Sequence, residues 1–285
     1  MTKTSPKPTT RIDYGRRVAR VMAYINDHLD EELTLERMAE IACFSPHHFH
    51  RIYRGIAGET ASDTIRRLRL QRAAYELTRS GMPIGRVARR AGYSSVEAFT
   101  RAFGADNGEP PAAYRSRLTP FYPIQNGDAP MPPVTIKTFS GASLAAIEHR
   151  GDYQTIGRSF DQLAAWAASH GLMDSPRRWF GIYYDDPASV PVAQLRSEAA
   201  VEVDPETPLA DGMVRREIPP ARVASIVHKG PYAELERTYR QLFSEWLPAS
   251  GEEPSDRPCF EHYINDARTV PPPELLTEIL LPLKG

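Results

Sequence analysis

One carboxylate stands among aromatic residues late in the chain, and a related segment earlier in the chain lacks it. The later segment reads FEHY (260–263), and its Glu261 corresponds to Gly181 in the earlier FGIY. Because side chains alternate along a strand, Glu261 and Tyr263 should share one face, as should Gly181 and Tyr183. A carboxylate beside aromatic rings can attract a flat or cationic organic molecule.

If the two segments face each other, they and two nearby helix starts would enclose a cleft around Glu261. Its walls would be aromatic, and Glu261 would supply the negative charge. The spacing alone leaves a second interpretation open, in which Glu261 lies on a solvated strand face or pairs with an arginine on a neighbouring strand. The residues expected to line the cleft are Tyr153, Trp179 or Phe180, Tyr183, Tyr232 and Tyr263.

These aromatic residues belong to a unit that the chain contains twice. EHRGDYQTIGRSF (148–160) returns 79 residues later as VHKGPYAELERTY (227–239). Alternating and helical apolar spacing predicts two strands, a helix and two further strands in each unit, with the glycine of HxGxY at the turn into the helix. We therefore predict a duplicated α+β fold with an antiparallel sheet. The expected strands are 134–139, 143–151, 179–185 and 198–203, then 213–218, 222–230, 259–266 and 276–283, and the expected helices are 153–169 and 232–247.

The first part of the chain also repeats itself, in a pattern of two short helices. TLERMAEIACFSPHHFHRIYR (34–54) and PIGRVARRAGYSSVEAFTRAF (83–103) share apolar residues at helical spacing, followed by a turn. Ser45 or Ser94 could cap the second helix of each copy. A plain helical bundle would show the same spacing, but two copies, each with an arginine on the outer face near its end, in a basic part of the chain favour a helix-turn-helix pair.

A longer helix should connect these two copies. The segment 61–81 is rich in arginine and helix-forming residues, with Ser62 or Asp63 available to cap its start and Gly81 at its end. A helix of this length could set the two reading helices near the spacing of successive major grooves, so that one chain does the work of a dimer.

Charge divides the chain into a basic and an acidic part. Up to Leu118 there are 20 Lys and Arg against 13 Asp and Glu, a balance of +7, and the remainder has a balance of −8. Between them, TPFYPIQNGDAPMPP (119–133) contains five prolines in fifteen residues, which is typical of an extended linker. We expect a DNA-binding domain at 14–118, a linker at 119–132 and a second domain at 133–285, with a polyanion as partner of the first.

The run from SPHHFHRIYRGIAGETASDTIRRL through PIGRVARRAGYSSVEAFTRAF to PPAAYR resembles the DNA-binding domain of AraC-family transcription regulators. The resemblance implies double-stranded DNA as partner, with base contacts from both reading helices. Arginine suits this role because its planar fork donates to both acceptors of guanine. The residues that the resemblance assigns are His47, His50 and Arg51 in the first helix, and Val96, Glu97, Thr100 and Arg101 in the second.

The HHFH motif at 47–50 also places two histidines one helical turn apart, a spacing that could suit a metal ion. The motif itself contains no cysteine or acidic residue, and the AraC-like context accounts for both histidines as groove-facing donors. We therefore expect no metal and no cofactor.

HKGPY, FEHYIND and the terminal TEILLPL resemble the GyrI-like small-molecule-binding domain over residues 133–285. The order of the two domains is that of Rob-type AraC regulators. The resemblance implies that Glu261 meets cationic ligands, with Tyr153, Tyr183, Tyr232 and Tyr263 as further ligand-binding positions.

Together these features predict a ligand-responsive transcription regulator that is not an enzyme, with DNA, a small effector and RNA polymerase as partners. The alternative is that the acidic part resembles GyrI-like hydrolases, in which the same Glu works with a Tyr as a general base on reactive electrophiles. The chain lacks a GxSxG motif and a His/Cys pair. Fusion to a DNA-binding domain favours the regulator.

The 285 residues, 41% hydrophobic and 25% charged, indicate a globular protein. The start of the chain lacks the apolar core of a signal peptide, and no apolar run reaches the length of a membrane span. Cys43 and Cys259 are read as reduced thiols. We expect a cytoplasmic protein without membrane contact.

Overall fold

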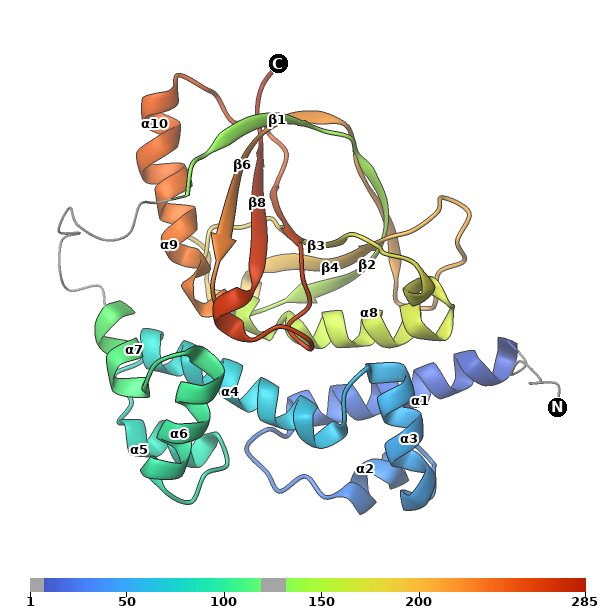
Figure 1. The fold of residues 1–285 in the computed structure, drawn as a ribbon. Coiled ribbons are helices and arrows are strands. Elements are labelled where there is room, and N and C mark those ends of the chain that lie inside the picture. The colour runs from blue at the N-terminus through green and yellow to red at the C-terminus, as the bar shows by residue number, and fades with distance from the viewer. Residues whose placement is uncertain (1–7, 119–131) are drawn as a thin grey trace. The chain divides into compact units, whose positions relative to one another are not determined.

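The computed structural model describes residues 8–118 and 132–285, with side chains from Ile12 onward (Figure 1). Of the predicted linker 119–132, only Pro132 lies within this description. The residues group into two compact units, each of which contains one helix-turn-helix copy and most of one α+β repeat. The first unit takes the chain up to Arg66 with Ala142–Trp179 and Asp185–Ile218, and the second takes Arg67–Gly141, Phe180–Tyr184 and Pro219–Gly285.

The first helix-turn-helix copy follows the predicted pattern. Phe49 and Tyr53 are fully buried on the inner side of the second helix of the pair, and the Tyr53 hydroxyl donates to Thr64 at 3.0 Å. The turn between the helices contains Cys43 in the left-handed backbone region, at φ 53°. The elements are α1 (Pro8–Asp27), α2 (Leu35–Ile41), α3 (Pro46–Ala57) and the first residues of α4 (Ala61–Arg79).

The second copy repeats the arrangement with a glycine in the turn. Gly92 has φ 85° at the position that corresponds to Cys43, so both turns require the left-handed region and only the second has the residue best suited to it. Phe99, Phe103 and Tyr114 are fully buried. The elements are the rest of α4, then α5 (Ile84–Arg90), α6 (Val96–Asn107) and α7 (Pro111–Leu118).

The predicted helix caps were wrong for α4 and α6, and for α3 the position was right but the side-chain bond was not. Ser95, rather than Ser94, caps α6 by accepting from the backbone N–H of Ala98 at 3.2 Å. Ser45 occupies the N-cap position of α3 but makes no capping bond with its side chain. Before α4, Thr60 accepts from the backbone N–H of Asp63 at 3.2 Å, so the cap precedes the predicted Ser62 and Asp63. Each serine or threonine was a suitable type, and the exact first turn decided which one bonds.

The two α+β repeats form antiparallel strands at all eight predicted places (Figure 1). The hydrogen-bonded strand order is β1-β6-β8-β7-β3-β4-β2-β5. Because β1 pairs with β6 and β5 pairs with β2, each repeat contributes its first strand to the other. The predicted fold class, a helical domain followed by a duplicated α+β domain, is confirmed. The strands are β1 (Thr135–Phe139), β2 (Ala142–Arg150), β3 (Trp179–Tyr183), β4 (Arg196–Glu202), β5 (Val214–Ile218), β6 (Ala221–Lys229), β7 (Cys259–Tyr263) and β8 (Leu276–Pro282).

The helices of the two repeats begin alike and then differ. Both start with a single 3₁₀ turn, after which the first repeat continues as one α-helix while the second passes through a π-helical segment. A π-helical segment is rare, and such segments are frequent at functional sites. The first repeat has η1 (Tyr153–Thr155), α8 (Gly157–Ser169), η2 (Leu172–Asp174) and η3 (Val192–Gln194). The second has η4 (Tyr232–Glu234), α9 (Leu235–Arg240), the π segment η5 (Gln241–Trp246), α10 (Leu247–Ser250) and η6 (Pro272–Glu274).

The repeated HxGxY phrase forms the same turn in both repeats. Gly151 and Gly230 have φ of 113° and 142°, which residues with a side chain rarely adopt. Their backbone N–H groups donate to Leu195 and Leu275, each at 2.9 Å. The phrase therefore occurs twice because each repeat needs this junction of strand and helix.

No helix among residues 8–118 and 132–285 is long and apolar enough to cross a membrane.

Candidate functional site

The residues predicted to read DNA in the first copy lie on the solvent side of α3. His47, His50 and Arg51 are exposed, whereas Phe49 and Tyr53 face the core. The apolar side of α3 fixes the helix, and the polar side is left free to meet a partner.

The second copy presents its predicted residues on α6 in the same way. Val96, Glu97 and Arg101 are exposed, and Thr100 is half-buried. Val96 is 40% exposed on this surface. The sequence therefore placed all seven residues on the two solvent-facing helix surfaces.

A different kind of site surrounds Glu261 on β7. Glu261 is only 2% exposed, and each of its two oxygens accepts from a tyrosine hydroxyl. Tyr239 donates to Oε1 at 2.9 Å, and Tyr263 donates to Oε2 at 2.8 Å. The hydroxyls of Tyr263 and Tyr183 are 2.8 Å apart, and the rings of Tyr263 and Tyr232 meet edge to face at 5.6 Å. We call these five residues the carboxylate cluster.

Burial dominates the electrostatics of the carboxylate cluster. It raises the pKa of Glu261 to about 7, and the hydrogen bonds from Tyr263, Tyr239 and Tyr183 oppose that rise. Burial and the neighbouring carboxylate raise the pKa of both Tyr239 and Tyr263, so these hydroxyls stay protonated and act as donors. The four tyrosines are half-buried, so they form a partly solvated aromatic rim around a buried acid.

Gly181 on β3 has no side chain because the tyrosine hydroxyls occupy that space. A Cβ there would lie 2.8 Å from the Tyr263 hydroxyl and 2.8 Å from Cε2 of Tyr183. The predicted alternation is thus confirmed, since Gly181 and Tyr183 lie on the face of the sheet that Glu261 and Tyr263 share. The first repeat provides room at the position where the second provides a charge.

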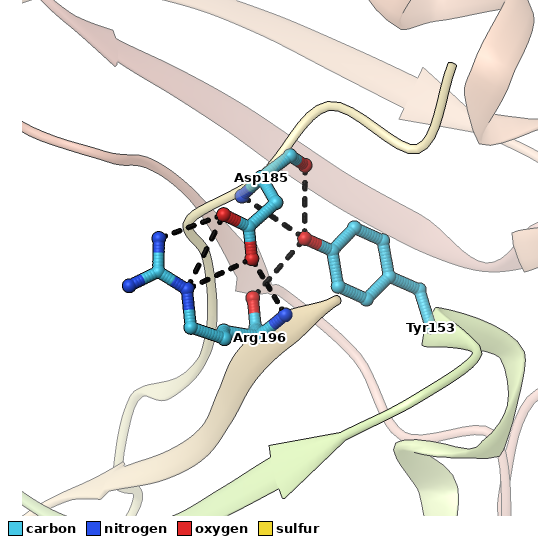
Figure 2. Close-up of polar contacts among 3 residues, drawn as sticks. All are labelled: Tyr153, Asp185 and Arg196. Carbon is cyan, nitrogen blue, oxygen red and sulfur yellow. Dashed lines mark hydrogen bonds and ion pairs between the residues drawn. The ribbon is translucent and has the colours of Figure 1, made fainter. Parts of the chain in front are cut away.

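Tyr153, one of the predicted lining residues, makes a separate set of contacts (Figure 2). Its hydroxyl lies 2.8 Å from the backbone oxygen of Asp185 and 3.1 Å from that of Arg196, and accepts from the backbone N–H of Asp185 at 3.1 Å. The Asp185 carboxylate in turn pairs with the Arg196 guanidinium at 2.7 Å. Tyr153 therefore ties η1 to the chain after β3 and to the start of β4.

Trp179 and Phe180, the two alternatives for one lining position, lie on opposite faces of β3. Phe180 is fully buried and packs against Phe139 and Phe260, with ring centroids 6.0 and 6.1 Å away. Alternation puts it on the face opposite Gly181, whereas Trp179 is half-buried on the face that Gly181 shares.

Tyr239 was not among the predicted lining residues, although the sequence contained a signal for it. The alignment of the two repeats pairs Tyr239 with Phe160, and helical apolar spacing accounts for both without using the hydroxyl. The hydroxyl is the sole difference between those side chains, and it appears in the repeat that also has Glu261. A difference between repeats that introduces both an acid and a hydrogen-bond donor indicates a shared site.

Within the part of the chain that the structure describes, no group of three or more His, Cys, Asp and Glu side chains could hold a metal ion. His47 and His50 of the HHFH motif lie exposed on α3.

Residues 132–284 match the family model of the GyrI-like small molecule binding domain, and residues 38–117 match a helix-turn-helix domain. A DNA gyrase inhibitor of Erwinia billingiae (strain Eb661) is 34% identical over 121 residues, which are 39% of this chain and 72% of that protein. Regulatory protein SoxS of Escherichia coli (strain K12) is 34% identical over 98 residues, 34% of this chain and 92% of SoxS. The match to a cryo-EM structure of an EcmrR–DNA complex covers 88% of this chain and 98% of the chain in that structure, at 15% identity and a TM-score of 0.48.

Proposed function

The chain belongs to the GyrI-like small-molecule-binding family and joins this domain to an AraC-type helix-turn-helix domain, and we propose that its carboxylate cluster holds a cationic aromatic effector. It is a DNA-binding transcription regulator. What is proposed here is the place and the charge of the molecule to which the regulator responds.

The observation that supports this proposal is the buried acid with its tyrosine rim. Glu261 has a pKa of about 7, so near neutral pH a large share of molecules carries a negative charge in a setting that disfavours it. A cation beside Glu261 would remove that penalty, and the faces of the surrounding rings would attract the same charge. Each oxygen already accepts one hydrogen bond, so the main contribution of the effector would be to balance the charge.

The same arrangement argues against a hydrolase. A general base must reach the proton that it removes, directly or through one water. Each Glu261 oxygen accepts from a tyrosine hydroxyl, and the pKa values of both hydroxyls are raised, so neither tyrosine is a ready base. The relatives described above are a regulator and a gyrase inhibitor. We infer a binding function without turnover, and an assay of the full-length protein for hydrolysis of reactive esters would contradict this if activity depended on Glu261.

The effector proposal is tested by calorimetry with tetraphenylphosphonium as the cation and triphenylphosphine oxide as a neutral compound of similar bulk. Glu261→Gln keeps the size of the side chain and removes the charge, and its NH₂ group must donate to one of the two tyrosine oxygens where the carboxylate accepts. We expect it to weaken binding of the cation by up to about 3–5 kcal/mol, less if the site stays partly wet, and to change binding of the neutral compound little. Glu217→Gln, at an exposed position of β5, is the control and should change neither. Equal losses for both compounds would contradict a charge-reading role.

For DNA, we propose that α3 and α6 read separate halves of one site, through the seven exposed and half-exposed residues named above. Arg51→Ala and Arg101→Ala should each weaken specific binding by roughly 1–3 kcal/mol, and each should relax sequence preference at a different half. Footprinting and binding titrations at fixed salt measure both effects. Footprints and affinities equal to those of the parent would contradict the assignment. RNA polymerase as a further partner and a cytoplasmic location remain predictions.

A further inference from the structure

We propose that Thr277 on β8 is a further specificity-determining residue, whose hydroxyl forms a hydrogen bond with the effector. This inference rests on the proposed function, since it adds a neutral polar contact to the site that Glu261 defines. It predicts that the natural effector carries a hydrogen-bonding oxygen or nitrogen in addition to its positive charge.

The position of Thr277 supports this role. Its register partners are Tyr263 on β7 and His228 on β6. Residues directly opposite one another in an antiparallel pair point to the same face, with Cβ atoms about 5 Å apart. Thr277 therefore lies next to Tyr263 on the face that carries Glu261.

The state of its hydroxyl is the second observation. Thr277 is 0% exposed, and its Oγ1 has no hydrogen-bond partner among the described residues. A buried hydroxyl without a partner is unfavourable, and most such groups in proteins find one. A ligand that reaches the cluster could supply the missing partner, because a hydroxyl both donates and accepts.

In the first repeat, the residue that corresponds to Thr277 has a hydrogen-bond partner. There Ser197 corresponds to Thr277, and its hydroxyl bonds to Nδ1 of His149 at 3.0 Å. In the second repeat His228 bonds instead to Thr238 at 2.8 Å and faces the backbone oxygen of Pro231 at 3.3 Å. The histidine has turned away from Thr277 in the repeat that has the acid, and this change frees the hydroxyl beside the acid.

A first experiment needs no ligand. Thr277→Val keeps the shape of the side chain and removes the hydroxyl, and Ser197→Ala removes the bonded hydroxyl of the first repeat as the matched control. We expect the melting temperature of full-length Thr277→Val to equal or exceed that of the parent, whereas Ser197→Ala should melt several degrees lower. A drop for Thr277→Val as large as that for Ser197→Ala would show that Thr277 already has a partner, and would overturn the proposal.

A second experiment compares tetraphenylphosphonium with the ortho, meta and para isomers of hydroxyphenyl-triphenylphosphonium. We expect at least one isomer to bind the parent about five- to tenfold more tightly than tetraphenylphosphonium, and Thr277→Val to abolish that advantage. Affinity for tetraphenylphosphonium itself should change less than about twofold in Thr277→Val, as expected for a residue that contacts only the added hydroxyl.

The outcomes separate the two proposals. If the cations bind and Glu261→Gln weakens them, but no isomer has an advantage or Thr277→Val leaves it intact, the role of Thr277 is wrong and the effector site stands. If none of the cations binds, or Glu261→Gln has no effect on them, the effector site is wrong and the role of Thr277 falls with it.

Discussion

The two α+β repeats share a fold, and three of the positions at which they differ belong to or adjoin the carboxylate cluster in the second repeat. The first repeat has Gly181, Phe160 and a serine whose hydroxyl is bonded to histidine. The second has Glu261, Tyr239 and a threonine whose hydroxyl has no partner among the described residues. The turn, the strands and the glycine junction are otherwise the same.

This comparison shows how duplication separates structure from chemistry. The residues common to both repeats, such as Gly151 and Gly230, maintain the junction of strand and helix. The residues that differ introduce an acid, a donor to it and a free hydroxyl into one repeat, while Gly181 in the other makes room for the tyrosines. Gly181 of the first repeat thus leaves space for the site, and Glu261 of the second repeat gives the site its charge.

The largest expected effect concerns the charge of Glu261 and its pH dependence. Its folded pKa of about 7 lies above the ordinary value of 4.5, so its contribution to stability is fully present below about pH 4.5 and is lost as the pH rises to 7. Glu261→Gln cannot ionise, so its stability relative to the parent should rise by about 3 kcal/mol across that window and then level off. Urea unfolding of both proteins between pH 4 and 8 measures the difference, and a flat difference would show that Glu261 is not held in this state.

A smaller effect is expected from making the second repeat like the first at the helix position. Tyr239→Phe removes the donor to Oε1 and should cost roughly 2 kcal/mol at pH 8, where the carboxylate is charged, and less at pH 5. The reciprocal Phe160→Tyr is the control, since it adds a hydroxyl in the repeat that lacks the acid and should bring no gain. Unfolding measured at both pH values would refute the pairing if the loss were the same at each.

The smallest expected effect tests the room that Gly181 provides. Gly181→Ala would place its methyl group 2.8 Å from the Tyr263 hydroxyl, so the tyrosine pair must shift, at a cost of about 1–2 kcal/mol. Gly157→Ala, where an added Cβ meets nothing within 4 Å, is the matched control and should be neutral or slightly stabilising, since alanine favours a helix. Thermal unfolding compares the two, and equal behaviour would mean that the tyrosines do not need the space.

Much of the fold could be predicted from the sequence because it depends on local periodicity. Alternation along the strands placed Glu261 and Tyr263 on one face, and helical spacing placed Arg51 and Arg101 on the solvent side of their helices. The two repeats could be recognised in the sequence because the same pattern recurs at a fixed offset, and the same pattern indicates the same helices and strands. These features need no knowledge of which segments meet.

Only the tertiary structure decided which partners each polar group found. Tyr153 and Tyr232 occupy the same place in their repeats, yet the first bonds to backbone and the second packs against Tyr263. Tyr239 lies on a helix 22 residues before Glu261 and donates to its carboxylate. His228, the register partner of Thr277, bonds to Thr238 instead of to Thr277. Periodicity fixes the face on which a side chain points, but a hydrogen bond forms within about 3 Å, and that distance is set by how helix and sheet pack.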